Sequence, residues 1–251
     1  MNVVVAADRP MRGTNPLYPW SDGKPMAENT VQHRWIVALH GTLDDLLRDD
    51  PHVFVGSDNL IYPVENHNEI CLAPDVYVAF GRPKEDRGSY NVFEEGGVFP
   101  QVIFEVRSPG NRAGEMARKL VFYDQYGAEE YYDFDPQRNR LRVYTRTDGQ
   151  FDEVPEVNGF VSPRLGIRFD TTGPELVVTR PTGEPFLTYQ EVCDARAAAR
   201  DRAEAERHRA VRAEARAKRA EARAEKAQAE SDRFRAMLRA AGIDPDAAPP
   251  A

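Results

Sequence analysis

Apolar side chains recur every three or four residues between Ala27 and Leu47, which is the spacing of one face of an α-helix. Asn29 and Thr30 are suitable N-cap residues, and Pro51 follows soon after the last apolar position. The pattern therefore predicts a first helix over Ala27–Leu47. Its apolar positions are Val31, Trp35, Leu39, Leu43, Leu46 and Leu47.

Short runs of Val, Ile, Leu and aromatic residues follow, separated by Gly, Ser, Asp, Asn and Pro, and this pattern is typical of β-strands. We expect the first three runs to form an antiparallel meander. A fourth run contains one acid, Glu105, and a carboxylate in a buried strand is rarely without a partner. The predicted strands are Val53–Val55, Leu60–Val64, Val76–Phe80, Gln101–Val106, Glu130–Phe134 and Leu141–Tyr144.

A second helix is predicted over Ala113–Tyr126, with Gly127 at the position where helices commonly end in a left-handed residue. It lies between the strands Gln101–Val106 and Glu130–Phe134. A strand, a helix and a second strand form a crossover unit whose two strands are parallel. The fold class is therefore α/β, with a mixed sheet flanked by helices.

The two ends of the chain differ from this middle part. Residues 1–26 contain four prolines with glycines between them, which favours a loosely packed, irregular arm. From about Tyr189 to Leu238 there is no proline or glycine, and Ala, Arg and Glu dominate, which predicts a long helix. The predicted organisation is an arm (1–26), an α/β domain (27–185) and a charged helical tail (186–251).

The tail carries a seven-residue repeat of mostly alanine positions, which is the spacing of a coiled coil. Alanine buries little area, so this seam supports at most modest self-association, and a single charged helix in solvent is the alternative. Glu206, Arg196 and Ser231 interrupt the seam. Its two core positions hold Ala203, Ala210, Ala217, Ala224 and Leu238, and Val192, Ala199, Ala213, Ala220, Ala227 and Phe234.

The formal net charge is -8, and the excess of acid lies in residues 1–185, because the tail has slightly more basic than acidic residues. An acidic domain is repelled by a phosphate backbone unless a basic surface or a metal ion reverses the local field. The charge therefore argues against a protein that coats DNA generally.

Neither a membrane span nor a signal peptide is expected, because no run of about 18 apolar residues occurs and charges interrupt the first 20 residues. Cys71 and Cys193 are far apart and have no zinc-binding spacing. We expect both to be reduced thiols in a cytoplasmic protein.

Two carboxylates have the spacing of a metal-dependent hydrolytic site. Asp75 follows Pro74 at the start of one predicted strand, and Glu105 lies near the end of another. Carboxylates on adjacent strand ends bind Mg²⁺ or Mn²⁺, and a nearby lysine, here Lys119, stabilises charge that develops on a phosphate. The simpler alternatives are a turn residue for Asp75, an ion pair of Glu105 with Arg107 or Lys119, and a solvated Lys119.

Four blocks of sequence resemble the Uma-type endonucleases, a bacterial branch of the PD-(D/E)XK nuclease superfamily. They occur in the family's order between Tyr18 and Phe169, and Ala128 and Tyr132 are mild departures. The blocks are Tyr18–Glu28 (YPWSDGKPMAE), Ala73–Val78 (APDVYV), Phe104–Pro109 (FEVRSP) and Lys119–Pro136 (KLVFYDQYGAEEYYDFDP).

This resemblance implies a restriction-endonuclease-like core that hydrolyses DNA with Mg²⁺ or Mn²⁺. It implies Asp75 and Glu105 as metal ligands, the Val106 carbonyl as a third ligand and Glu28 as an outer acid. The superfamily's catalytic lysine falls at Arg107, which is permanently protonated and cannot act as a base. Either Lys119 replaces that lysine, which we favour, or Arg107 supplies electrostatic stabilisation alone.

A competing hypothesis keeps the nuclease fold without turnover. In that case the protein is a binding or scaffold protein that self-associates through its C-terminal helix. A homodimer through the core or the helix is compatible with either hypothesis. The tyrosines at 123, 126, 131 and 132 are expected to be core residues without a function of their own.

Overall fold

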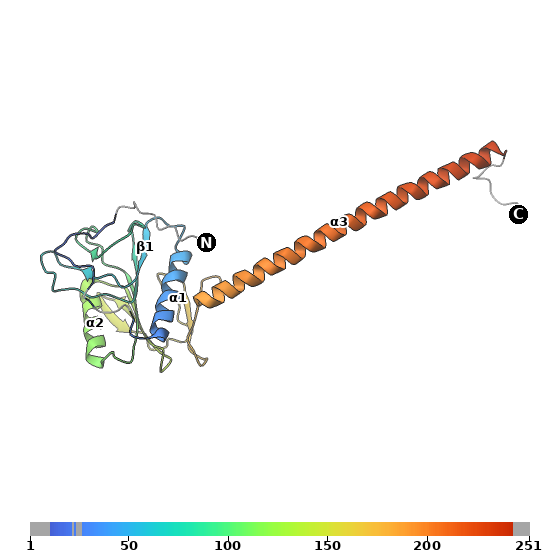
Figure 1. The fold of residues 1–251 in the computed structure, drawn as a ribbon. Coiled ribbons are helices and arrows are strands. Elements are labelled where there is room, and N and C mark those ends of the chain that lie inside the picture. The colour runs from blue at the N-terminus through green and yellow to red at the C-terminus, as the bar shows by residue number, and fades with distance from the viewer. Residues whose placement is uncertain (1–10, 22, 24–26, 243–251) are drawn as a thin grey trace. The chain divides into compact units, whose positions relative to one another are not determined.

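The computed structural model describes residues 11–21, 23 and 27–242 of the chain. Its contacts divide the chain into two units, Met1–Glu191 and Val192–Ala251. The first unit contains a six-stranded mixed sheet in the order β1-β3-β5-β6-β7-β8, with α1 and α2 on its opposite sides (Figure 1). The strands are β1 (Val53–Gly56), β3 (Val76–Phe80), β5 (Val102–Val106), β6 (Glu130–Asp135), β7 (Arg140–Thr147) and β8 (Gln150–Glu153).

Helix α1 (Thr30–Leu46) begins three residues later than predicted, because Asn29 caps it. The Asn29 side-chain oxygen accepts hydrogen bonds of 2.9 Å from the backbone N–H groups of Val31 and Gln32. The buried face is also rotated from the predicted stripe, since Trp35 is only partly buried. The buried residues are Gln32, Ile36, Leu39, Thr42 and Leu43.

Helix α2 (Ala113–Tyr126) has the predicted bounds, and Gly127 ends it with a φ of 94°. That left-handed conformation is strained for a residue with a side chain, which explains the glycine. The strands that α2 connects, β5 and β6, are parallel, as the crossover predicts. The α/β fold class is therefore confirmed.

Alternating side chains along the strands form two separate cores. On one face, Val76, Phe104 and Val106 pack in the same cluster as the apolar residues of α1. On the other face, Tyr77 and Ile103 pack with residues of α2. The predicted core tyrosines at 123, 131 and 132 are at most 1% exposed, whereas Tyr126 is only partly buried.

The predicted antiparallel meander is wrong for its second run. Only β2 (Ile61–Tyr62) forms there, and it pairs in parallel with β4 (Tyr90–Asn91) outside the main sheet. A further antiparallel pair, β9 (Arg168–Asp170) with β10 (Val177–Thr179), was not predicted. These strands are two or three residues long, too short for an alternating pattern to stand out in the sequence.

Residues 11–21 form no helix, and most of their side chains are exposed. Tyr18 is buried: it is 2% exposed, and its ring lies 5.1 Å from that of Tyr62 and 5.0 Å from that of Phe93. Tyr18 and the ion pairs of Arg12 hold this part of the arm against the domain. Residues 1–10 of the predicted arm lie outside the described residues.

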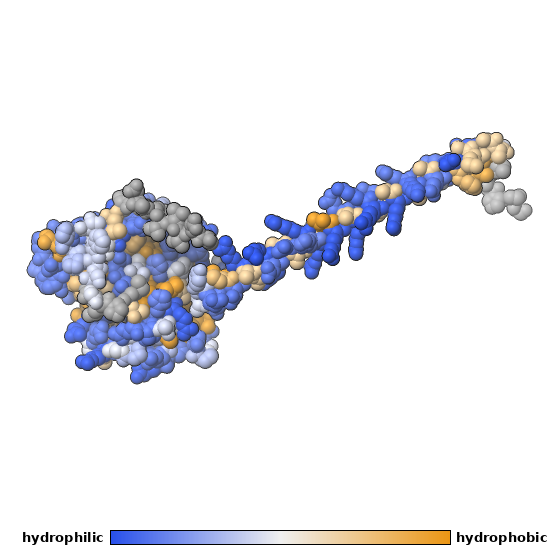
Figure 2. Space-filling model, viewed as in Figure 1, coloured by the Kyte–Doolittle hydropathy of each residue, from blue (hydrophilic) through white to orange (hydrophobic). Residues whose placement is uncertain are grey.

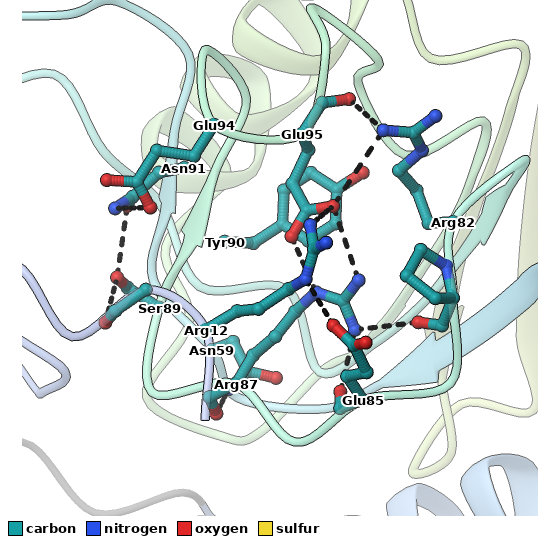
Figure 3. A network of polar contacts seen from close by, with 12 residues as sticks. Arg12, Asn59, Arg82, Glu85, Arg87, Ser89, Tyr90, Asn91, Glu94 and Glu95 are labelled. Carbon is teal, nitrogen blue, oxygen red and sulfur yellow. Dashed lines mark hydrogen bonds and ion pairs between the residues drawn. The ribbon is translucent and has the colours of Figure 1, made fainter. Parts of the chain in front are cut away.

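A charged cluster joins the arm to the domain (Figure 3). The Glu95 carboxylate is 2.8 Å from the Arg87 guanidinium and 3.3 Å from that of Arg12. Arg82 donates a hydrogen bond of 2.6 Å to the Glu95 backbone carbonyl. Arg87 has no exposed side-chain surface and lies 4.0 Å from the centre of the Phe54 ring. The cluster is a structural anchor, because its charges are paired with one another.

Helix α3 (Tyr189–Ala240) has 52 residues and none of them is buried. Hydrophilic side chains cover most of its surface (Figure 2). Among the described residues, no helix combines the length and apolar character needed to cross a membrane. Neither Cys71 nor Cys193 forms a disulfide.

Candidate active site

The sheet register brings the two predicted carboxylates together. Strands β3 and β5 are antiparallel, with Val76 opposite Phe104. Asp75 precedes Val76 at the start of β3, and Glu105 follows Phe104 on β5. These two residues therefore lie side by side, just beyond the last paired residues. One Asp75 oxygen (Oδ2) accepts a hydrogen bond of 2.6 Å from the backbone N–H of Val106, which orients the carboxylate.

Glu105 is almost fully buried, and each of its oxygens has a partner on α2. Lys119 Nζ lies 2.6 Å from Oε2, and the Tyr123 hydroxyl donates a hydrogen bond of 2.7 Å to Oε1. Lys119 and Tyr123 are four residues apart, so they share one face of the helix. The crossover helix thus positions two donors over the end of β5.

The electrostatics of the site follow from burial and from the close carboxylates. Burial, and then the charge of Glu105, raise the pKa of Asp75 to about 8. Burial also raises the pKa of Glu105, despite the opposing effect of Lys119. Burial by itself lowers the pKa of Lys119, but the charges of Glu105 and Asp75 outweigh it and the pKa is raised. Lys119 is therefore an ammonium ion at neutral pH, beside two carboxyl groups that a further cation would stabilise.

Arg107 lies on the same strand as Glu105 but is engaged elsewhere. Its guanidinium makes two hydrogen bonds of 2.5 Å to the Asp133 carboxylate on β6, and Arg142 adds a third of 2.9 Å. Hydrogen bonding to Asp133 raises the pKa of Arg107. The side chain thus forms a structural ion pair, and the structure brings Lys119, rather than Arg107, to Glu105.

The other two predicted metal-site groups are connected through α1. The Gln32 side-chain amide donates a hydrogen bond of 2.9 Å to the Val106 carbonyl. Its oxygen accepts one of 2.9 Å from the Glu28 backbone N–H. The Glu28 carboxylate itself accepts a hydrogen bond from the Ser108 hydroxyl. Glu28 is therefore placed at the rim of the site, with Ser108 as its partner.

An open, polar groove of about 810 Å³ runs over these residues. Two arginines of the α2 region, Arg112 and Arg118, line it together with Asp75 and Lys119. Within the described part of the chain, neither arginine forms an ion pair. Most other arginines of the domain do, so these two are distinctive as free cations beside the carboxylates. The remaining lining residues are Glu28, Gln32, Asp58, Leu72, Ala73, Ser108, Gly110, Asn111, Gly114 and Glu115.

The sequence of the domain matches a known protein family. The sequence profile of the Uma2 family, described as "Putative restriction endonuclease", matches residues 11–178, which include the whole sheet and the groove. The chain belongs to the Uma2 family. No curated protein matches the chain.

A solved structure also shows a likeness. It is titled a "putative nuclease belonging to DUF820" from Anabaena variabilis, with 12% sequence identity and a TM-score of 0.42. The match covers 57% of this chain and 79% of that one. At this level the likeness adds nothing to the argument about residues.

The donor set of the Uma2 domain fits a hard divalent cation. Asp75, Glu105 and the Val106 carbonyl offer oxygen atoms only, which suits Mg²⁺ or Mn²⁺. No group of three or more His, Cys, Asp or Glu side chains with metal-binding geometry occurs among the described residues. A Mg²⁺ site does not require one, because this ion commonly takes one or two carboxylates and keeps several waters.

Sequence reasoning missed two contributors to this Uma2 site. Tyr123 was assigned to the core alone, yet its hydroxyl is a partner of Glu105. Gln32 was not singled out, yet it holds the Val106 carbonyl. Tyr123 is four residues from Lys119 on one helix, but this spacing suits a core residue equally well. Gln32 left no signal, because Glu28 precedes the helix that carries Gln32.

Proposed function

We propose that this Uma2 protein is a metal-dependent endonuclease that hydrolyses phosphodiester bonds of DNA. The observation that carries the proposal is the meeting of Asp75 and the buried Glu105 from two strands with Lys119 from α2, beside an open groove that Asp75 and Lys119 line. Membership of the family supports the nuclease class.

In this proposal Asp75, Glu105 and the Val106 carbonyl hold Mg²⁺ or Mn²⁺, and Glu28 is an outer acid at the rim. When bound, such an ion polarises a phosphoryl oxygen and lowers the pKa of a bound water. The backbone N–H of Val106 orients the Asp75 carboxylate, which lines the groove, and Tyr123 and Lys119 hold the buried Glu105 carboxylate beside it. Gln32 performs the same task for the Val106 carbonyl.

Lys119 takes the part of the superfamily's lysine. Its raised pKa keeps it protonated, so it supplies positive charge to the phosphate and does not accept a proton. Arg107 is assigned a structural role instead, because its Nε and Nη2 groups are committed to Asp133. These contacts support Lys119 over Arg107 for this part.

Arg112 and Arg118 are the proposed contacts to the substrate backbone. A guanidinium matches the two oxygens of a phosphate, and an arginine without an acidic partner is available for that contact. The domain as a whole is acidic, and the groove brings three cations, Arg112, Arg118 and Lys119, next to its acidic residues.

A cleavage assay tests the proposal. Purified wild type is expected to cut plasmid DNA with Mg²⁺, and Glu105→Gln and Lys119→Met are expected to lower the rate about a hundredfold or more. Glu129→Gln is the matched control, because Glu129 pairs with Arg164 rather than lining the groove. Full activity of Glu105→Gln would remove the basis of the proposal.

A further inference from the structure

Eight of the fourteen Lys and Arg side chains on α3 lie in one stripe along the helix. An α-helix turns about 100° per residue, so positions that alternate spacings of three and four share one face. Two series of basic residues follow this rule, each with a spacing of seven and the second offset from the first by three. The first series is Arg202, Arg209, Arg216 and Arg223, and the second is Arg212, Arg219, Lys226 and Arg233.

These eight residues, here called the basic stripe, project into solvent. All are exposed, and within the described residues none of them has an ion-pair partner. The ion pairs that do form on this helix, such as Lys218 with Glu214 at 2.8 Å, involve other positions. None of the eight cations is therefore held in a direct ion pair on the described helix.

Acidic residues lie away from the stripe at its centre. Between Arg209 and Lys226 the acids are Glu214, Glu221 and Glu225, and helical geometry places all three about half a turn away. In this stretch the acids thus lie opposite the stripe, together with one further basic residue, Lys218. The first series ends at Arg223, because the position seven residues later is Glu230. The second series begins at Arg212, because the position seven residues earlier is Ala205.

We propose that the basic stripe binds the phosphate backbone of duplex DNA. From Arg202 to Arg233 it extends over about 45 Å, at about 1.5 Å per residue. Duplex DNA presents one negative charge per about 1.7 Å of axis, so a straight row of cations meets phosphates along this length. The stripe reads no sequence, because contacts to phosphates alone carry none.

The composition of the helix favours DNA over other anions. A helix that lies on an anionic membrane carries bulky apolar residues opposite its basic face. Here the opposite side holds Glu214, Glu221, Glu225 and Lys218, and the intervening residues are mostly alanine. The acidic domain of this chain gains little attraction to DNA outside its groove. The basic stripe supplies positive charge that the domain lacks.

The choice of DNA rests on the proposed function, but binding by the stripe does not require the active site. The test therefore measures binding in EDTA, where cleavage plays no part. The probe is a fluorescein-labelled DNA duplex of about 30 base pairs, titrated with the full chain at several salt concentrations.

Two variants of equal charge are compared. The stripe variant replaces Arg212, Arg216, Arg219 and Arg223 with Gln, and the control replaces Arg196, Arg200, Arg207 and Lys218, on the opposite side, with Gln. Gln and Arg have similar helix propensities, so circular dichroism should show equal helicity.

The stripe variant is expected to bind DNA at least about tenfold more weakly at low salt. If each of the four residues contacts one phosphate, the plot of the log association constant against the log salt concentration becomes less steep by about 3.6. The control is expected to stay close to wild type. Equal losses in both variants would overturn the proposal, because charge alone would then explain binding.

Two further outcomes would also overturn it. Loss of binding to phosphatidylserine vesicles, with unchanged binding to DNA, would make the stripe a membrane contact. A lowered solution mass of the stripe variant, again with unchanged DNA binding, would make it an interface between copies of this chain.

Discussion

Replacing Asp75 with Asn tests the electrostatics of the site without any ligand. Asp75 lies beside Glu105 and is partly buried, and burial together with that neighbour raises its pKa to about 8. Asparagine has nearly the same shape, and its side-chain oxygen can still accept the hydrogen bond from Val106. The substitution therefore removes the titration and little else.

The sign and size of the effect follow from the two pKa values. An Asp in an unfolded chain has a pKa of about 3.9. Between about pH 4 and pH 8 the unfolded chain has lost this proton while the folded protein retains it, so wild-type stability falls as the pH rises. At about 1.36 kcal/mol per pH unit, a gap of about four units gives an upper bound of about 5 to 6 kcal/mol. Because solvent screens a partly buried group, we expect about 2 to 4 kcal/mol.

Urea unfolding at a series of pH values, in EDTA, measures this effect. The free energy of unfolding of Asp75→Asn should rise relative to wild type from about pH 4 to pH 8, then run parallel above it. Asp170→Asn is the control, because Thr172 lowers the pKa of Asp170 and this exposed residue is ionised in both states above about pH 5. A constant difference between Asp75→Asn and wild type across this range would refute the reasoning.

Three further changes have expected outcomes. Tyr123→Phe should lower the free energy of unfolding by about 1 to 3 kcal/mol in urea titrations, since Glu105 loses a buried hydrogen bond. Arg87→Met should cost about 3 to 5 kcal/mol in the same assay, because it leaves Glu95 with its weaker partners, and unchanged stability would contradict the anchor role. Deleting residues 192–251 should leave the thermal unfolding midpoint of the domain unchanged in calorimetry, because α3 buries no side chain.

Local signals predicted several elements to the residue. Strand β3 is a clean β-type run between Pro74 and Gly81, and α2 ends at a glycine that its geometry requires. The crossover rule then gave the parallel pairing of β5 with β6. In each case the determining interactions lie within or next to the element itself, which is why sequence alone was sufficient.

Non-local packing explains what was not predicted. The partner of β2 is β4, almost 30 residues later, and no periodicity connects the two. Tyr18 looks like a residue of an irregular arm until the ring of Tyr62 is placed against it. Such contacts depend on the whole fold and leave no mark on local spacing.

The residues of the candidate site also fall into those that the sequence indicates and those that it does not. The proximity of Asp75, Glu105 and Lys119 could be predicted because their residue types and motif positions point to one chemistry, and their roles stay a prediction. Tyr123 and Gln32 could not, because a tyrosine on an amphipathic helix or a glutamine on a capped one is explained equally well without a site. Their roles became visible only through hydrogen bonds to Glu105 and Val106.

Calorimetric titration of Mn²⁺ into wild type and into Asp75→Ala, in low-phosphate buffer, tests the central claim most directly. A DNA-cleavage assay on the same samples completes it. We predict that wild type binds the ion and cuts DNA, and that Asp75→Ala does neither while remaining folded by circular dichroism. Absence of binding to both proteins would contradict the claim and favour a catalytically silent binding or scaffold protein.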